Sequence, residues 1–289
     1  MSTAASEIRR MAHAKVNLSL AVNGLRSDGF HEICSWVTPI DWHDEVIIRH
    51  AERFSLEVLG RCEGVPSDSR NLVWRAAGAL AAAAQREPDV SITLHKHLPH
   101  GAGLGGGSSD AAATLLALAD LWGLDWPMSR LVAIAATLGS DVPFFMYNAS
   151  AVIRGRGEIV EPVGQSPEMW LVLAMPAFAS ATPDVYRAWD ELVTPPSTSQ
   201  MPWRKAFGSA ATLAESLFND LEPAAFSFDP RLADLHRRLD RLAGRSVRMT
   251  GSGSAFFSLF DTRGEAVEWA STAAPRAGPD VAFEVVRTL

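Results

Sequence analysis

The stretch from Pro99 to Asp110, PHGAGLGGGSSD, decides the fold. Five of the seven residues from Gly101 to Gly107 are glycine. Because glycine lacks a Cβ, successive backbone N–H groups can approach one polyanion closely, and the chain can adopt positive φ angles. A flexible turn before an ordinary helix is the alternative interpretation, and so dense a run of glycine disfavours it. The stretch therefore predicts a loop that binds phosphate groups.

A helix should follow this loop without a break. Apolar residues recur at helical spacing from Ala112 to Ala119, and the pattern extends to about Trp122. Ser108 or Ser109 would cap this helix, whose free N–H groups and dipole also attract phosphate. The serine hydroxyls could contact phosphate or a bound magnesium ion. The candidate phosphate contacts are Gly101, Gly103, Leu104, Gly105, Gly106, Gly107, Ser108 and Ser109.

Two common nucleotide-binding motifs do not explain the loop. No Gly-Lys-Ser or Gly-Lys-Thr triplet occurs in the chain, which excludes a Walker A sequence. The glycines of Gly103–Gly107 also lack the flanking βα unit and the following acidic residue of a dinucleotide-binding fingerprint. Other residues must therefore identify the class of phosphate-binding protein.

Composition and charge narrow that class. The 289 residues are 47% hydrophobic and 20% charged, as in a soluble globular chain, and the net charge of −7 argues against nucleic acid as a partner. Cys34 and Cys62 are the only cysteines, too few for a disulfide framework or a cysteine-rich metal site. The chain shows no signal sequence before Ala14, and its alanine-rich stretch at 76–84 is too short to span a membrane. We expect a cytoplasmic protein without a membrane anchor.

Strands and helices are mixed along the chain without strict βαβ alternation, which favours an α+β fold. Val16, Leu18 and Leu20 alternate with polar or small residues, the period of a strand with one buried face. Trp42–Glu45 is interpreted as a turn that starts a strand, and residues 194–204 as a flexible excursion. The length fits two domains, 1–162 and 163–289. Further strands are predicted at 45–50, 54–59, 90–98, 170–175, 247–249, 255–260 and 282–286, and helices at 71–84 with Asn71 as cap, at 129–137, from Pro183 with Thr182 as cap, at 210–218, at 230–242 with Asp229 as cap, and from Gly264.

Three motifs together resemble those of one enzyme family. Gly103–Ala112 is similar to the phosphate-binding signature of GHMP kinases, which include galactose, homoserine and mevalonate kinases. Ala14–Leu20 (AKVNLSL) resembles their first motif, and Met249–Ala255 (MTGSGSA) resembles their third. The resemblance implies a two-domain fold, ribosomal-protein-S5-domain-2-like and then ferredoxin-like, with the active site in the cleft between the domains. It also implies ATP as phosphoryl donor, with Mg²⁺ held mostly by phosphate oxygens and water.

Asp141 and Lys15 are the candidate catalytic residues. Asp141 lies in an apolar segment just before Val-Pro, where its residue type and position alone slightly favour an ordinary turn-capping carboxylate. However, Gly139–Pro143 matches the segment that holds the catalytic aspartate of GHMP kinases, and Lys15 matches the lysine of their first motif. The resemblance implies that Asp141 takes the proton of the acceptor hydroxyl while Lys15 keeps Asp141 ionised and orients that hydroxyl.

The sequence RSDGFH at Arg26–His31 points to the acceptor. A β-turn explains its Ser-Asp-Gly core but not the adjoining Phe30 and His31. A very similar sequence occurs in the branch of GHMP kinases that acts on a cytidine-diphosphate-linked methylerythritol. That resemblance implies that Phe30 stacks on cytosine, that His31 hydrogen-bonds the edge of the base, and that Asn17 lies beside the substrate. Phenylalanine replaces the tyrosine often found there, so stacking is kept and a hydroxyl contact is lost.

The second half of the chain offers further substrate contacts. TPDVY at Thr182–Tyr186 resembles the segment of the same branch that closes the cytosine sandwich, although an amphipathic helix explains Tyr186 equally well without the family. Gly251 and Ser252 of the third motif are assigned to the same substrate. Aromatic stacking on a base contributes roughly 1–3 kcal/mol, enough to select a nucleotide-bearing acceptor.

The adenine side has weaker candidates. Asn71 and Lys96 match positions that line it in relatives, but Lys96 could instead extend its stem along the strand and face solvent. His95, His97 and His100 have no carboxylate or cysteine near them in sequence to complete a metal site. The resemblance therefore implies a kinase that transfers the terminal phosphoryl group of ATP to the C2 hydroxyl of the cytidine-diphosphate-linked methylerythritol. Rivals are a GHMP kinase for homoserine or mevalonate, and a nucleotide-binding regulatory protein without turnover.

Overall fold

A computed structural model describes residues 7–163, 168–192, 202, 208–241 and 245–289. Its first sheet has the strand order β3-β4-β2-β5-β6, with β1 paired to β2. All its pairings are antiparallel except that of β3 with β4. The strands are β1 (Glu7–Leu25), β2 (His31–His50), β3 (Ser55–Gly60), β4 (Val90–Lys96), β5 (Ala151–Gly155) and β6 (Ile159–Pro162).

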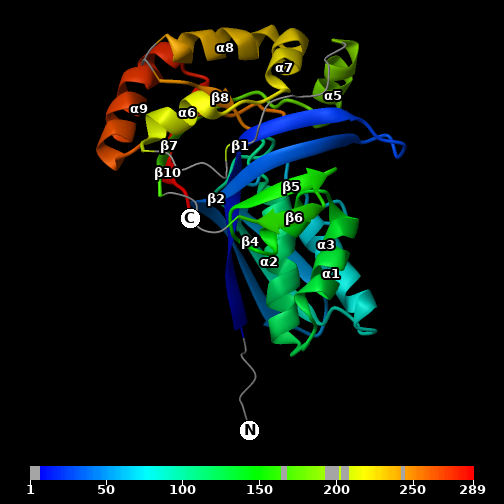
Figure 1. The fold of residues 1–289 in the computed structure, drawn as a ribbon. Helices are drawn as coiled ribbons and strands as arrows, with labels where there is room; N and C mark the ends of the chain where they lie inside the picture. Colours follow the sequence, from blue (N-terminus) through cyan, green and yellow to red (C-terminus); the bar gives the residue numbers. More distant parts are fainter. Residues whose placement is uncertain (1–6, 164–167, 193–201, 203–207, 242–244) are drawn as a thin grey trace.

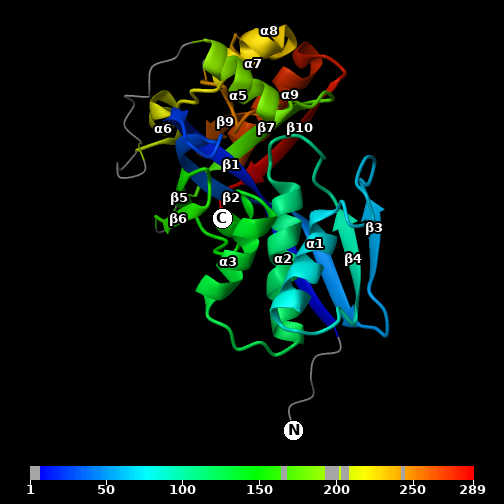
Figure 2. The ribbon, with the colours of Figure 1, turned by 90° about the vertical axis from the view of Figure 1, so that its right-hand side faces the viewer.

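Helices of the first half pack on this sheet. The central helix α2 (Gly106–Leu121) contacts β1 and β2 and lies beside α1 (Leu72–Ala83) and α3 (Met128–Leu138), as Figure 2 shows. The short helix α4 (Val142–Phe145) packs on α2 and α3. Fully buried aliphatic and aromatic side chains fill the space between helices and sheet. The predicted phosphate loop thus enters the helix at the centre of this layer.

A second, four-stranded antiparallel sheet has the order β10-β7-β9-β8. Its helices lie above the first sheet in Figure 1, and the long β1–β2 hairpin extends under α5. The first sheet uses only residues before 163 and the second only later ones, in agreement with the predicted division at 162/163, which stays a prediction. The elements are β7 (Trp170–Pro176), α5 (Thr182–Glu191), α6 (Ala210–Ser216), α7 (Glu222–Phe228), α8 (Pro230–Asp240), β8 (Arg248–Met249), β9 (Phe256–Phe260), α9 (Arg263–Ala277) and β10 (Val281–Arg287).

The α+β fold is confirmed, but the prediction that β1 has one buried face is wrong. Asn17 and Ser19, on the supposedly exposed face, are 5% and 0% exposed. The second half of the chain covers that face: the Asn17 backbone N–H donates to Thr250 Oγ1 at 2.9 Å, and Leu20 forms a β-bridge with Asn219. The strand alternation is real, yet its polar members satisfy their hydrogen bonds inside the protein.

The turn predicted at Trp42–Glu45 is also wrong, because β2 continues through it from His31 to His50. Asp44 within it is completely buried. A carboxylate can be buried only when it is paired and hydrogen-bonded, and Asp44 is both, through Lys96 and two backbone N–H groups. Asp44 of the predicted turn is thus an interior ion-pair partner.

Of the four predicted helix caps, two are confirmed and two are wrong. Asn71 Oδ1 accepts the Val73 N–H at 2.8 Å, and Asp229 accepts the Arg231 N–H, as predicted. Helix α2 begins at Gly106, earlier than either serine, because Gly105 ends the loop at φ +73°. Helix α5 has Ala181 rather than Thr182 as its cap residue. Helices α4 and α7 and strands β5 and β6 were not predicted, and 194–204 lies outside the described residues except for Pro202.

No helix in the described part of the chain has both the length and the apolar character needed to cross a membrane.

Candidate active site

A cavity of about 640 Å³ lies between the two halves of the chain. The β1–β2 hairpin and the residues around Asp141 form one wall, and α5 with the turn at Gly251 forms the other. Most of the substrate contacts predicted from the sequence are therefore brought together. Those lining the cavity are Lys15, Asn17, Phe30, His31, Gly103, Gly105, Asp141, Thr182, Tyr186, Gly251 and Ser252.

The phosphate loop is held by contacts that only glycine permits. Gly103 and Gly105 have φ angles of +77° and +73°. A Cβ on Gly103 would lie 2.6 Å from the carbonyl oxygen of Gly253, and a Cβ on Gly105 would lie 2.6 Å from the Phe145 ring. The Lys15 N–H donates to the Leu104 carbonyl at 3.0 Å. The three sequence motifs thus meet at one loop, with backbone against backbone.

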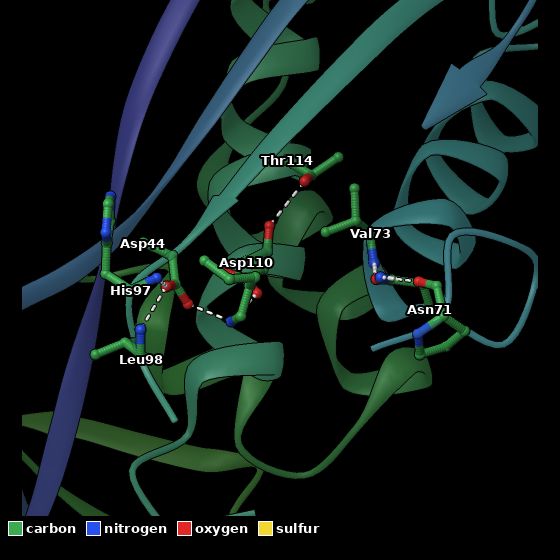
Figure 3. A network of polar contacts seen from close by, with 9 residues as sticks. Asp44, Asn71, Val73, His97, Leu98, Asp110 and Thr114 are labelled. Atoms are coloured by element: carbon green, nitrogen blue, oxygen red, sulfur yellow. Dashed lines mark hydrogen bonds and ion pairs between the residues drawn. The ribbon is translucent and has the colours of Figure 1, made fainter. Parts of the chain in front are cut away.

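A buried network lies behind the loop (Figure 3). The Lys96 ammonium donates to Asp44 and, at 2.8 Å, to Asp110 Oδ2. Asp44 Oδ1 also accepts the N–H groups of His97 and Leu98, at 2.6 and 2.8 Å. One ammonium therefore faces two carboxyl groups. Burial, partly offset by Lys96, raises the pKa of Asp110 to about 8, so this carboxyl keeps its proton near neutral pH.

This network explains the position of Lys96. Its side chain is nearly completely buried, and its Nζ would lie 3.4 Å from a Cβ on Gly106. Lys96 thus supports the first turn of α2 from inside the protein instead of extending its stem to solvent. A contact between Lys96 and adenine remains a prediction.

The candidate catalytic pair lies next to the loop. Lys15 Nζ is 3.9 Å from Asp141 Oδ2 and donates a hydrogen bond to Asn17 Oδ1. The Lys15 side chain is 7% exposed and that of Asp141 is 42% exposed. Burial lowers the pKa of Lys15, and the charge of Asp141 opposes that effect. A carboxylate open to the cleft, beside an ammonium fixed from behind, can accept a proton from a bound hydroxyl.

An aromatic cluster lies at the other end of the cleft. The His31 ring stacks on Tyr186, with 4.7 Å between centroids, and its Nε2 lies 2.8 Å from Asp190 Oδ1. Phe30 is 47% exposed. Across the cleft, the hydroxyls of Thr182 and Ser252 are 2.7 Å apart, so Thr182 bonds the third motif instead of capping its helix. The cluster joins the two halves of the chain around a space suited to a flat ring.

Two stretches of the sequence match family models. Residues 71–149 match the GHMP kinases N terminal domain, and residues 203–278 match the GHMP kinases C terminal. The chain is 40% identical over 260 residues to a protein of Jannaschia sp. (strain CCS1) named 4-diphosphocytidyl-2-C-methyl-D-erythritol kinase, covering 89% of this chain and 90% of the relative. The chain belongs to the GHMP kinases.

Solved GHMP kinases share the fold. A crystal structure of 4-(cytidine 5'-diphospho)-2C-methyl-D-erythritol kinase has a TM-score of 0.77 and 35% identity, over 96% of this chain and 99% of the other. Homoserine kinase from Cytophaga hutchinsonii has a TM-score of 0.73 at 17% identity, over 100% and 96%. The second likeness shows the fold alone. The fold alone therefore does not identify the acceptor of a GHMP kinase. The acceptor has to be inferred from the side chains of the cleft.

Some predicted site residues of this GHMP kinase do not line the cleft. Asn71 uses both polar atoms of its side chain on backbone groups, Oδ1 as the helix cap and Nδ2 donating to the Pro66 carbonyl at 2.7 Å. Leu104 is 2% exposed, so only its backbone belongs to the loop. Gly101 lines a separate cavity of about 190 Å³ together with Phe178 and Ala282. Gly106, Gly107, Ser108 and Ser109 form the first turn of α2.

An Mg²⁺ ion carried in with ATP fits these residues. The described residues contain no group of three or more His, Cys, Asp or Glu side chains that could hold a metal by themselves. Magnesium bound to a triphosphate keeps phosphate oxygens and water as ligands and needs no such group. Ser108 and Ser109 lie in the first turn of α2, directly after the glycine loop, and their hydroxyls would be the candidate protein contacts of the ion. When bound, the ion would neutralise charge on the phosphates.

Sequence reasoning missed Arg156 and Asp190, which both line the cleft. Asp190 lies four residues after Tyr186 on α5, so helical spacing from the predicted aromatic could have found it. Arg156 lies between Gly155 and Gly157, a turn signal that follows an apolar run at Ala151–Ile153. Its neighbours in space, however, come from distant parts of the chain.

Proposed function

We propose that this GHMP kinase transfers the terminal phosphoryl group of ATP to the C2 hydroxyl of 4-diphosphocytidyl-2-C-methyl-D-erythritol, giving the 2-phosphate and ADP. The reaction belongs to the non-mevalonate route to isoprenoid precursors. One observation carries the proposal: a single cleft has Lys15 and Asp141 beside the glycine loop at one end and Phe30, His31 and Tyr186 at the other. Relatives with that name, matching nearly the whole chain, support it.

The reacting end of the cleft fits phosphoryl transfer. Gly103 and Gly105 line the cleft and α2 begins directly after them, so backbone N–H groups of the loop and of the helix N-terminus would bind the triphosphate. Phosphoryl transfer depends mainly on positioning and on stabilising charge. Asp141 would accept the proton of the acceptor hydroxyl, while the Lys15 ammonium, held by Asn17, keeps Asp141 ionised and orients that hydroxyl.

The other end of the cleft fits a cytosine base. Phe30 presents an exposed ring, and Tyr186 is fixed by its stacking on His31. Where His31 Nε2 donates to the Asp190 carboxylate, Nδ1 of the same ring serves as an acceptor. That atom is suited to the exocyclic amine of cytosine. Neither homoserine nor mevalonate has a ring that would use these side chains.

The proposal is tested with a panel of acceptors and γ-labelled ATP. Label should move to the cytidylyl acceptor and not to homoserine or mevalonate. Transfer to homoserine or mevalonate but not to the cytidylyl compound would contradict the proposed substrate. If none of the acceptors in the panel causes ADP release, a nucleotide-binding protein without turnover is favoured instead.

We also propose that the enzyme works in the cytoplasm on small molecules, with ATP and Mg²⁺ and without a nucleic-acid partner. The net charge of −7 supports the last point, because nucleic-acid binding depends on clustered positive charge.

A further inference from the structure

Arg156 differs from the other long cations of the cleft. It lies in the turn between β5 and β6, and its guanidinium carbon is 5.0 Å from the centroid of the Phe30 ring. Among the described residues, no carboxylate lies within ion-pair distance of this guanidinium, whereas Lys15 faces Asp141 and Arg187 bonds Asp184 at 2.9 Å. Arg156 is thus a cation whose charge is available to a ligand in the cavity that it lines.

The turn that carries Arg156 is attached to both ends of the cleft. On one side, a Cβ on Gly157 would lie 3.2 Å from the carbonyl oxygen of Ser140, so the turn packs against the residue before Asp141. On the other side, the Gly155 N–H donates to Glu32 Oε1 at 3.1 Å, directly after His31. Arg156 therefore lies between the candidate catalytic carboxylate and the aromatic cluster.

This position coincides with the part of the acceptor that carries negative charge. In a cytidine-diphosphate-linked alcohol, the diphosphate joins the nucleoside to the alcohol that is phosphorylated. If the base lies at Phe30 and the reacting hydroxyl at Asp141, the diphosphate must cross the space between them. A guanidinium offers planar N–H donors that match phosphate oxygens, and no carboxylate has to be displaced first.

We propose that Arg156 binds the diphosphate of the acceptor and so makes the enzyme select nucleotide-linked alcohols over free ones. This inference rests on the proposed function, since it assigns a role within that substrate site. The guanidinium of Arg156 lies over the Phe30 ring, which holds its plane and leaves the N–H groups at its edge for phosphate. Arg156 is therefore a specificity-determining residue that contacts substrate away from the reacting atoms.

The test compares Arg156→Met and Arg156→Lys with the matched control Arg154→Met. Arg154 is on β5 of the same hairpin, forms an ion pair with Glu161 and does not line the cleft. Calorimetry should show that Arg156→Met weakens CDP binding about tenfold or more, the loss expected for a charge-assisted phosphate contact, while cytidine binding changes less than about twofold. Arg156→Lys should recover part of the CDP affinity, and the control should match wild type.

Kinetics give a second readout. Arg156→Met should raise KM for the cytidylyl acceptor and leave KM for ATP and kcat nearly unchanged, because the contact is equal in ground and transition states. Equal loss of CDP and cytidine affinity would overturn the proposal and reduce Arg156 to a support for Phe30. Unchanged CDP affinity would also overturn it. A folded wild type that binds CDP through Arg156 but does not phosphorylate the cytidylyl compound would contradict the proposed function instead.

Discussion

Lys15 is the residue on which the reacting end of the cleft is built. The register of β1 against β2 shifts between His13 and Lys15, an irregularity of the kind that re-aims a side chain. A Cβ on Gly105 would lie 3.0 Å from the Lys15 stem, and one on Gly251 would lie 3.5 Å from its ammonium. Three motifs that are far apart in the sequence therefore enclose this side chain. The enclosure explains why glycines occur at those two positions.

Asp141→Asn should lower kcat by roughly 10²–10⁴, the usual contribution of a general base, with little change in either KM. The amide keeps the size of the side chain but cannot accept the proton. A coupled assay of ADP release with the cytidylyl acceptor measures the effect. Near-normal turnover would show that Asp141 is not the base.

Lys15→Arg should fail nearly as badly as Lys15→Met. The site around the ammonium has no room for a planar guanidinium, because Gly105 and Gly251 approach the side chain closely and the residue is almost completely buried. The same ADP assay, with a thermal melt to confirm folding, compares the two variants. Recovery of activity in Lys15→Arg but not in Lys15→Met would mean that positive charge alone is sufficient.

At the scale of elements, the glycine loop and α2 work as one unit. Gly103 has φ +77°, and a Cβ there would lie 2.6 Å from a backbone oxygen of the third motif. Gly103→Ala should therefore weaken ATP binding and lower the melting temperature, because neither the loop nor the turn opposite can move without loss. Gly78→Ala is the control: it lies in α1 with nothing within 4 Å of the new methyl, and it should not lower the melting temperature. Equal melting temperatures and ATP affinities for Gly103→Ala and wild type would contradict this account of the loop.

The Asp44–Lys96–Asp110 network behind the loop should make stability depend on pH. Because the pKa of Asp110 is raised to about 8 in the folded protein, the folded state holds a proton that the unfolded state has already lost above about pH 4. The contribution of Asp110 to stability thus falls as pH rises through this window and levels off above pH 8. Asp110→Asn cannot ionise and lacks this dependence.

Melting temperatures of Asp110→Asn and wild type between pH 5 and pH 9 test this sign. The melting temperature of the variant should rise relative to that of wild type as the pH rises. A difference in melting temperature that stays constant across the range would contradict the raised pKa of Asp110. So would a variant whose melting temperature falls relative to wild type at high pH.

Local sequence patterns predicted helices, strands and helix caps better than they predicted the burial and the tertiary contacts of individual residues. The helix after the glycine run and the caps at Asn71 and Asp229 depend on neighbouring residues, and the structure confirms them. The burial of Asp44 depends on Lys96, which lies 52 residues further along, so its sequence context suggested only a polar turn. Arg156 escaped prediction for the same reason, since Phe30 and Ser140 come close to its turn only in the folded chain.

At the scale of the whole molecule, the cleft exists because each half of the chain completes the other. Asn219, which sequence patterns did not single out, donates to the carbonyls of Met249 and Gly251, both at 2.8 Å, and so fixes the third motif against β1. The β1–β2 hairpin carries Lys15 at its middle and Phe30 at its end, under α5. The glycine loop, the candidate catalytic pair and the aromatic cluster therefore line one cleft although their motifs are spread over most of the sequence.

A crystal structure with the cytidylyl acceptor and a non-hydrolysable ATP analogue tests the central claim most directly. The terminal phosphate should contact backbone N–H groups between Gly103 and Ser109, with the C2 hydroxyl roughly 2.6–3.2 Å from Asp141, the reach of a general base. A triphosphate bound away from this loop, or an acceptor hydroxyl out of reach of both Asp141 and Lys15, would contradict the account.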